Sequence, residues 1–231
     1  MDTRAEMETE LVAQLQVAAN SSLFPASRIT TLIQNSHKWA TNLFIWNDLV
    51  KAKITSTQAT FEYYDYPDNF RSGTIVRLEV SGDSYERKNY EDYLDYKENN
   101  STTTKKMFAN YGRFYFTNPV PTADGSNDMT VWGAVQADPL SAAGTETIFT
   151  NNKPEGNEAI VQRAFGVAMR RIDPKVSETA TAGSIAILAK LNLDEAKATQ
   201  RDQRLDHPMF EVPNLFGDTK LSPIGRFNYQ P

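Results

Sequence analysis

The stretch VRLEVSGDSYERKN, residues 76–89, decides the architecture of the middle of the chain. Val76, Leu78 and Val80 alternate with charged residues, and this period of two is typical of a β-strand with one buried and one solvated face. The Ser-Gly-Asp that follows predicts a turn, and the remaining residues predict a returning strand. The stretch is therefore interpreted as a β-hairpin.

Strand patterns extend on both sides of this hairpin, from about residue 51 to residue 150. Met107–Thr117 and Met129–Ala134 predict further strands, and the loop 118–125 between them is rich in proline and glycine. Seven of the ten tyrosines lie between Tyr63 and Tyr96, and tyrosine suits a half-exposed sheet face because its hydroxyl stays in water. Since turns rather than crossover helices join the candidate strands, we predict a mostly antiparallel sheet.

Helical periodicity precedes the β zone, in residues 1–50. Apolar residues recur at helical spacing over Glu6–Ala19, and a second stripe runs from Ile29 to Trp46. His37 lies near the edge of this second stripe and has no potential metal ligand four residues away. We interpret it as an ordinary helix residue.

Helical periodicity returns in residues 151–207. Pro154 predicts a helix start, and Asp173-Pro174 predicts a break before a second, long helix. Small residues on the second helix are expected to let another helix approach closely. They are Ala180, Ala182, Gly183 and Ala186. After Leu193 the sequence turns polar and predicts a helix that is solvated or stands clear of the body of the protein.

The last 24 residues, 208–231, form a different kind of segment. Four prolines, at 208, 213, 223 and 231, disfavour helix and central strand. Large aromatic side chains are spaced along the segment and need a surface on which to bury. They are Phe210, Phe216, Phe227 and Tyr229. We predict an extended arm that leaves its own helices and packs these four residues on another subunit.

Together these patterns predict an α+β protein. Residues 1–50 and 151–207 are expected to form an α-helical bundle from both chain ends. Residues 51–150 are expected to form an inserted, mostly antiparallel β domain, and residues 208–231 the extended C-terminal arm.

Composition excludes several classes of function. The net charge is −5, which argues against a protein whose main role is to bind the phosphate backbone of nucleic acids. The sequence contains no cysteine, which excludes thiol catalysis, disulfides and Cys-ligated zinc. No run of residues reaches the length of a membrane span, and the acidic first ten residues do not fit a signal peptide. We therefore expect a protein made in a cytosol that does not enter a membrane.

Three local patterns suggest chemistry without establishing it. Carboxylates lie among tyrosines in the β zone, as in sugar-processing clefts. They are Asp65, Asp68, Glu91, Asp92 and Asp95. The sequence does not show the pair of carboxylates at a defined separation that glycoside hydrolysis needs. The loop 124–128 lacks the terminal glutamate of a calcium loop and predicts a turn. The segment 105–116 interleaves bases and aromatics, yet it fits a strand with rings packed across a sheet better than an RNA-binding strand. We predict no catalytic residue, cofactor or metal.

Two further stretches carry a resemblance to a known family. FEYYDYPDNFR, residues 61–71, leads into the hairpin, and PEGNEAIVQRA, residues 154–164, begins the first helix after the β zone. With the order of helices, β insertion, helical hairpin and Pro/aromatic arm, the chain resembles the head-to-tail adaptor (connector) proteins of tailed bacteriophages over about residues 25–216.

The resemblance implies a non-enzymatic virion protein, assembled in the host cytoplasm. Such a protein forms a ring, usually a dodecamer, that joins the portal of the head to a tail-side neck or tail protein. Genomic DNA passes through the lumen without sequence readout, and an acidic chain suits such a conduit because like charges do not hold the DNA. The alternative is a carbohydrate-binding or carbohydrate-cleaving virion module built on the β domain.

Overall fold

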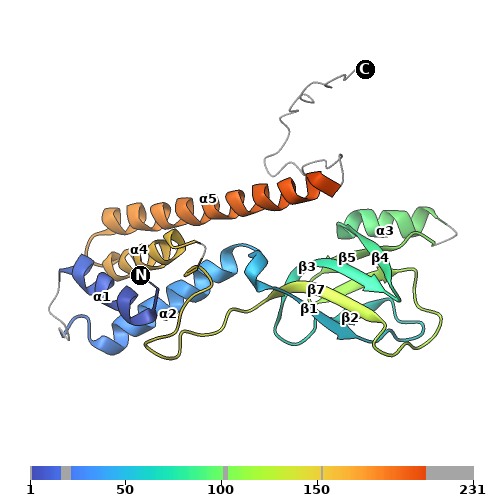
Figure 1. Ribbon diagram of the computed structural model, residues 1–231, viewed down its shortest axis with the longest axis horizontal. Coiled ribbons are helices and arrows are strands. Elements are labelled where there is room, and N and C mark those ends of the chain that lie inside the picture. Colours follow the sequence, from blue (N-terminus) through green and yellow to red (C-terminus); the bar gives the residue numbers. More distant parts are fainter. Residues whose placement is uncertain (1, 17–21, 101–103, 152, 207–231) are drawn as a thin grey trace, which may run out of the picture. The chain divides into compact units, whose positions relative to one another are not determined.

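The computed structural model describes residues 2–16, 22–100, 104–151 and 153–206, and for residues 199–206 it describes only the helical backbone. The protein is α+β, with five α-helices and one mixed seven-stranded sheet in these described residues (Figure 1). The chain divides into two units, Met1–Leu193 and Asp194–Pro231. The contacts described below lie in the first unit.

Helices from both ends of the first unit share one hydrophobic core. They are α1 (Arg4–Leu15), α2 (Ala26–Leu43), α4 (Glu155–Met169) and α5 (Pro174–Asp206). Helix α2 packs against both α1 and α4, and buried residues from all four helices, among them Leu11, Ile33, Ile160 and Leu188, belong to the same cluster. The regularly spaced apolar residues of each helix therefore lie in one common core.

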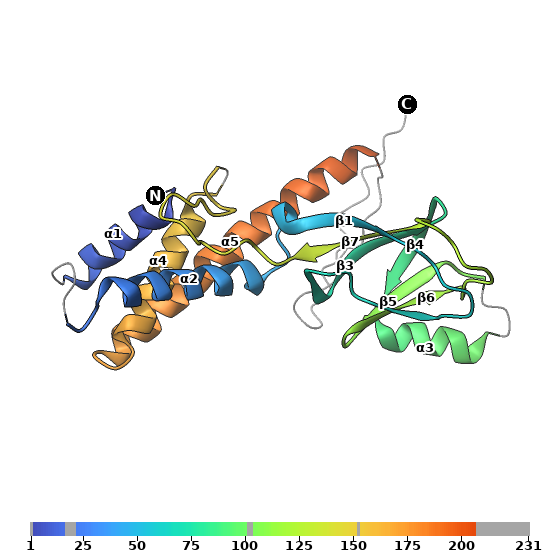
Figure 2. The same ribbon diagram turned by 90° about the horizontal axis from the view of Figure 1, so that it is seen from below.

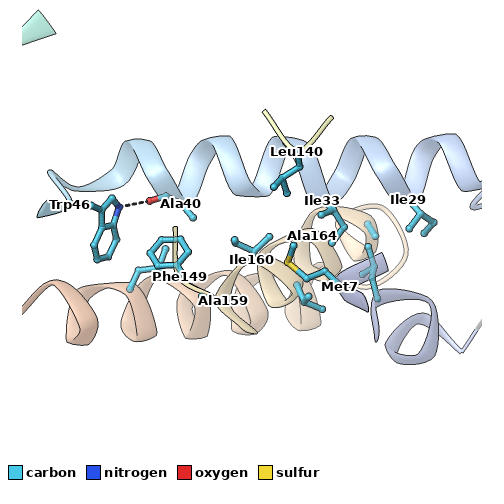
Figure 3. Packing of buried hydrophobic residues seen from close by; sticks show 14 of the residues in the cluster. Met7, Ile29, Ile33, Ala40, Trp46, Leu140, Phe149, Ala159, Ile160 and Ala164 are labelled. Carbon is cyan, nitrogen blue, oxygen red and sulfur yellow. Dashed lines mark hydrogen bonds between the residues drawn. The ribbon is translucent and has the colours of Figure 1, made fainter. Parts of the chain in front are cut away.

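Trp46 lies at one end of this core. The second helix was predicted to reach this residue, and it is shorter in the structure. Helix α2 ends at Leu43, so Trp46 follows the helix. Its fully buried ring meets Phe149 edge to face at a centroid distance of 5.1 Å, and its Nε1 donates to Ala40 O at 3.1 Å (Figure 3). The indole thus packs back on the helix that precedes it.

The predicted break between the last two helices is confirmed. Helix α4 ends at Met169 and α5 begins at Pro174, where a missing N–H costs no helical hydrogen bond. Asp173 Oδ1 accepts hydrogen bonds from the backbone N–H groups of Lys175 and Val176, at 3.1 and 3.2 Å, which caps α5. Helix α5 continues past Leu193 to Asp206, so the polar stretch is helical as predicted.

The sheet has the strand order β1-β7-β3-β4-β5-β6-β2. All neighbouring pairs are antiparallel except β4 and β5, which are parallel. The strands are β1 (Val50–Thr55), β2 (Tyr63–Asp65), β3 (Phe70–Val80), β4 (Asp83–Lys88), β5 (Met107–Tyr111), β6 (Phe114–Asn118) and β7 (Met129–Val135), with a 3₁₀ turn at Asn47–Leu49 before β1.

The predicted hairpin is confirmed, because β3 and β4 pair with Val80 opposite Asp83. Ser81 and Gly82 both have positive φ, at 51° and 82°, as a tight two-residue turn of this hand requires. The single strand predicted over Met107–Thr117 is wrong. It is a second hairpin, β5 and β6, which turns at Gly112 with a φ of 59°.

One crossover helix interrupts the β zone, contrary to the prediction that only turns join its strands. Helix α3 (Tyr90–Asn99) connects β4 to β5, and this longer connection allows the two strands to run parallel. Asn89 caps α3 by accepting a hydrogen bond from Asp92 N at 2.7 Å. Tyr93 of α3 is fully buried with Met107 and Ala109 of β5, so α3 covers one face of the sheet (Figure 2).

Arg71 links the sheet to α2. Its guanidinium donates to the carbonyls of Thr41, Asn42 and Phe44, at 3.1, 2.6 and 2.9 Å. The last carbonyls of a helix have no partner within the helix, and Arg71 supplies one. The arginine of the stretch FEYYDYPDNFR thus caps the C-terminal end of α2.

Candidate assembly surface

Exposed apolar side chains lie on both sides of the pair formed by α4 and α5. Their exposed fractions are between 37% and 55%, far above those of the shared core. They are Val167, Ile172, Val176, Ile185 and Leu193. Isolated exposed apolar residues are ordinary, but apolar residues that share a concave surface are typical of interaction sites.

Val167 and Ile185 share such a surface, a groove of about 590 Å³ between α4 and α5, which we call the α4–α5 groove. Apolar side chains form much of its wall, and charged groups lie along it. The lining residues are Arg163, Val167, Arg170, Pro174, Ser177, Glu178, Thr181, Ala182 and Ile185. Protein interfaces combine apolar and charged side chains in this way.

Close packing of the two helices fixes the base of this groove. A Cβ atom on Gly166 would lie 2.9 Å from Thr181 Oγ1 and 3.1 Å from Ser177 O, so α4 approaches α5 where it lacks a side chain. Arg163 donates to Thr181 Oγ1 at 3.1 Å, and its guanidinium lies 4.8 Å from the centre of the Trp39 ring. The floor of the groove is therefore closely packed.

The small residues predicted to permit helix approach divide into two sets. Ala180 lies against Gly166, and a Cβ atom on Gly183 would lie 3.1 Å from Gln162 Oε1 of α4, so these two positions face α4 as predicted. Ala182 and Ala186 are exposed. Ala182 lines the α4–α5 groove and keeps it open.

His37 occupies an environment that the sequence did not indicate. Its side chain is 4% exposed and lines a cavity of about 400 Å³ between α2 and residues 136–141. Burial lowers the pKa of His37 to about 4. Its Nε2 has no hydrogen-bond partner in the part of the chain that the structure describes. His37 is thus a buried, neutral imidazole, not a residue at the edge of the helical stripe.

A partly buried polar network under α3 was not predicted from the sequence. Tyr93 Oη donates to Glu62 Oε1 at 2.8 Å and lies 3.0 Å from Thr117 O. Lys97 of α3 forms an ion pair with the same Glu62 oxygen. Desolvation, followed by the bond to Glu62, raises the pKa of Tyr93. The network ties α3 to the sheet, and all its groups are engaged with one another.

Four of the five carboxylates considered for a sugar-processing site take part in local structure. Asp65 of β2 lies 3.5 Å from the Arg113 guanidinium. Glu91 and Asp92 lie in the first turn of α3, where carboxylates favour the helix start, and Asp95 accepts a hydrogen bond from Asn99. Asp68 is exposed in the turn before β3.

The other two patterns have structural roles. In the loop 124–128, Asp124 accepts from Ala59 N at 2.7 Å and Asp128 accepts from Thr57 N and Oγ1 at 2.9 and 2.6 Å, so these carboxylates tie the loop to residues 57–59. In the segment 105–116, the rings of Phe108 and Tyr115 are buried in the sheet core. Tyr111 is exposed and stacks on Tyr90 of α3 at a centroid distance of 4.1 Å.

The described residues hold neither a cluster of metal ligands nor a membrane-spanning helix. No three or more His, Asp and Glu side chains come together there as metal ligands would. None of the helices found there combines the length and the hydrophobicity of a membrane span.

Phe210, Phe216, Phe227 and Tyr229, the predicted contact residues of the arm 208–231, lie outside the described residues. Comparison with models of known protein families finds no match, and comparison with curated proteins finds none either.

Proposed function

We propose that this protein is a structural component of the neck of a tailed bacteriophage. In this proposal it forms a homo-oligomeric ring that joins the portal to a tail-side neck or tail protein and continues the DNA channel. The ring is a virion part without enzymatic activity, assembled in the host cytoplasm. The helices of both chain ends act as a bundle, the sheet as its insertion and residues 208–231 as an extended arm.

The observation that carries the proposal is the exposed apolar surface on both sides of α4 and α5. A ring subunit needs two contact surfaces, one for each neighbour. Exposed Val167 and Ile185 line the α4–α5 groove, and exposed Val176 lines a second groove with Phe165 and Ala180. The helical pair therefore offers apolar area to two neighbours, as a ring requires.

Replacing Val167 and Ile185 with serine tests the α4–α5 groove as a subunit contact. Both side chains are exposed, so the monomer should keep its stability within about 0.5 kcal/mol. We expect self-association to weaken at least tenfold, because the apolar area leaves water only in the assembly. Native mass spectrometry, with and without a portal ring, measures the assembly.

Ile54→Ser is the matched control, because Ile54 of β1 is an apolar residue that is even more exposed than Val167 and Ile185. It should leave assembly unchanged. A protein that stays monomeric at all concentrations and does not bind a portal ring would overturn the proposed function.

Deletion of residues 208–231 tests the arm. The described core is built from α1, α2, α4 and α5, so we expect the truncated protein to remain soluble and helical by circular dichroism. We expect it to lose its ability to join the neck, because several aromatic side chains at roughly 1.5–3 kcal/mol each can outweigh the cost of ordering the segment. Unfolding of the truncated protein, or assembly at full-length efficiency, would contradict the arm's role.

A further inference from the structure

The cavity beside His37 is enclosed between the side of α2 and the segment that follows β7. This segment, residues 136–141, runs alongside the helix (Figure 2). We call the space of about 400 Å³ between them the His37 cavity. His37 and Lys38 line it from the helix, and Ala137 and Pro139 line it from the opposite side. Its volume falls in the range of small-molecule sites, roughly 300–1,000 Å³.

The segment opposite α2 is held in place at both of its ends. At one end, Gln136 N donates to Asn69 O at 3.1 Å. At the other end, Leu140 is buried in the shared core of the helices. Its carbonyl accepts hydrogen bonds from Gln34 Nε2 of α2 and from Arg4 Nη1 of α1, both at 3.0 Å. The cavity is therefore formed by the fold itself, as small-molecule sites usually are.

Several polar side chains of the His37 cavity are not engaged with other described residues. His37 is 4% exposed, and its Nε2 has no hydrogen-bond partner among them. The side chains of Asn35, Asn42 and Gln136 also line the cavity, and none of the three forms a hydrogen bond with a described residue. Buried polar groups of native proteins are nearly always hydrogen-bonded. A buried, unpaired imidazole in the wall of a cavity therefore points to a bound partner.

The charge along the wall of the His37 cavity is positive. Lys38 is the only charged residue among the described residues that line it. Its side chain is exposed and forms no ion pair with a described residue. Asp138 belongs to the segment opposite α2, but it is exposed and does not line the cavity. An anion in the cavity thus meets a cation and no like charge on the wall.

Backbone carbonyls near the cavity, which would repel an anion, already have cationic partners. Arg71 caps the last carbonyls of α2, so the negative end of the helix is neutralised. Arg4 Nη1 donates to the carbonyls of Leu140 and Ser141, at 3.0 and 2.9 Å. Arg4 also pairs with Glu8 at 3.2 Å, so this carboxylate is engaged outside the cavity. The remaining positive charge at the wall is that of Lys38.

We propose that the His37 cavity binds a small organic anion, a carboxylate on a compact apolar body. The carboxylate accepts hydrogen bonds from the imidazole of His37 and from the ammonium group of Lys38, and such charge-assisted bonds are the strong ones. The apolar body packs on Ala137 and Pro139. The site does not depend on the proposed function, because neither the α4–α5 groove nor the arm contributes to it.

Binding of the anion is expected to be coupled to protonation of His37. Burial keeps the pKa of His37 at about 4 in the free protein, and a negative charge within about 4–6 Å raises it again. The complex therefore binds more protons than the free protein. Affinity for the anion should rise by about threefold or more as the pH falls from 7 to 5, because the charged imidazole holds the carboxylate more tightly. Calorimetric titration should show no such rise in His37→Phe.

Benzoate is a suitable probe of the site. In full-length His207→Gln protein, His37 is the single histidine, and its imidazole signal is followed by NMR at pH 7 during the titration. We expect a saturable shift with a Kd on the order of 1 mM, as is usual for so small a molecule. Benzamide has the same shape without the charge, and inorganic phosphate has the charge without the apolar body. Each should bind about tenfold more weakly, or less.

Lys38→Met, made in the same protein, removes the cation from an exposed side chain. It should weaken benzoate binding by about fivefold or more while the circular dichroism spectrum stays unchanged. Lys53→Met is the matched control, because Lys53 is an exposed lysine of β1, and it should leave the affinity unchanged.

Three results would overturn the proposal, each at a different point. Equal affinity for benzoate and benzamide would exclude an anion site. Equal affinity for benzoate and phosphate would exclude the organic body of the ligand. A His37 signal that does not respond to benzoate, or an equal loss of affinity in Lys38→Met and Lys53→Met, would show that the His37 cavity is not the binding site.

Discussion

Replacing Trp46 with alanine is expected to lower the free energy of unfolding by about 3–5 kcal/mol, because a large buried ring leaves a cavity that its neighbours fill only in part. Trp46 is fully buried against Phe44 and Phe149, at centroid distances of 5.7 and 5.1 Å. The substitution also removes the indole N–H that donates to Ala40 O at 3.1 Å. Urea unfolding followed by circular dichroism measures the loss.

Two variants separate the parts of this effect. Trp46→Phe keeps an aromatic ring and removes only the donor and part of the volume, so it should cost about 1–2 kcal/mol. Trp132→Ala is the matched control, because Trp132 of β7 is half-buried and lies under the Arg77 guanidinium. An equal loss for Trp46→Ala and Trp132→Ala would contradict the assignment of Trp46 to the shared core.

The local alternation of apolar and polar residues predicted the strands that have one apolar and one polar face. Alternation of apolar and charged residues located β3, the turn at Ser81-Gly82 and β4, and the pattern over Met129–Ala134 located β7. Proline located the break between α4 and α5. In each case the signal lies within a few residues of sequence, which is why it needed no knowledge of tertiary contacts.

Helix α3 was missed because its signals were attributed to the sheet. Tyr90, Tyr93 and Tyr96 lie three residues apart, which is helical spacing, and Asn89 is a favourable cap. The dense tyrosines nearby on β2 suggested one aromatic sheet face instead. Consequently the parallel pair β4 and β5, which depends on this crossover, could not be predicted either.

The α4–α5 groove lies between two consecutive helices, and the sequence predicted only part of it. Small residues on α5 indicated close approach, and Ala180 and Gly183 do face α4. The shared groove of Val167 and Ile185 was not predicted, because the sequence does not show how the edges of two packed helices meet. The buried environment of His37 requires residues 136–141, about one hundred positions away.

His37 is expected to make stability depend on pH between about 6.5 and 4. Its pKa is about 4 in the folded protein, against 6.5 for an unburied imidazole. The unfolded chain therefore binds a proton that the folded protein excludes, and the free energy of unfolding falls as pH falls below 6.5. By about pH 4, protonation of this residue in the unfolded chain has lowered the free energy of unfolding by on the order of 3 kcal/mol.

His37→Phe removes this titration while it keeps a ring in the same place. The unfolding free energy of the variant, followed by urea titration at several pH values, should fall less steeply than that of the wild type between pH 6.5 and 4. His207→Gln is the matched control, since it changes the chain's other histidine, and in full-length protein it leaves His37 as a single imidazole signal for NMR. That signal should titrate near pH 4, because desolvation disfavours the charged ring. A midpoint near 6.5, or equal pH dependence in wild type and His37→Phe, would show that the His37 side chain is in contact with water in solution.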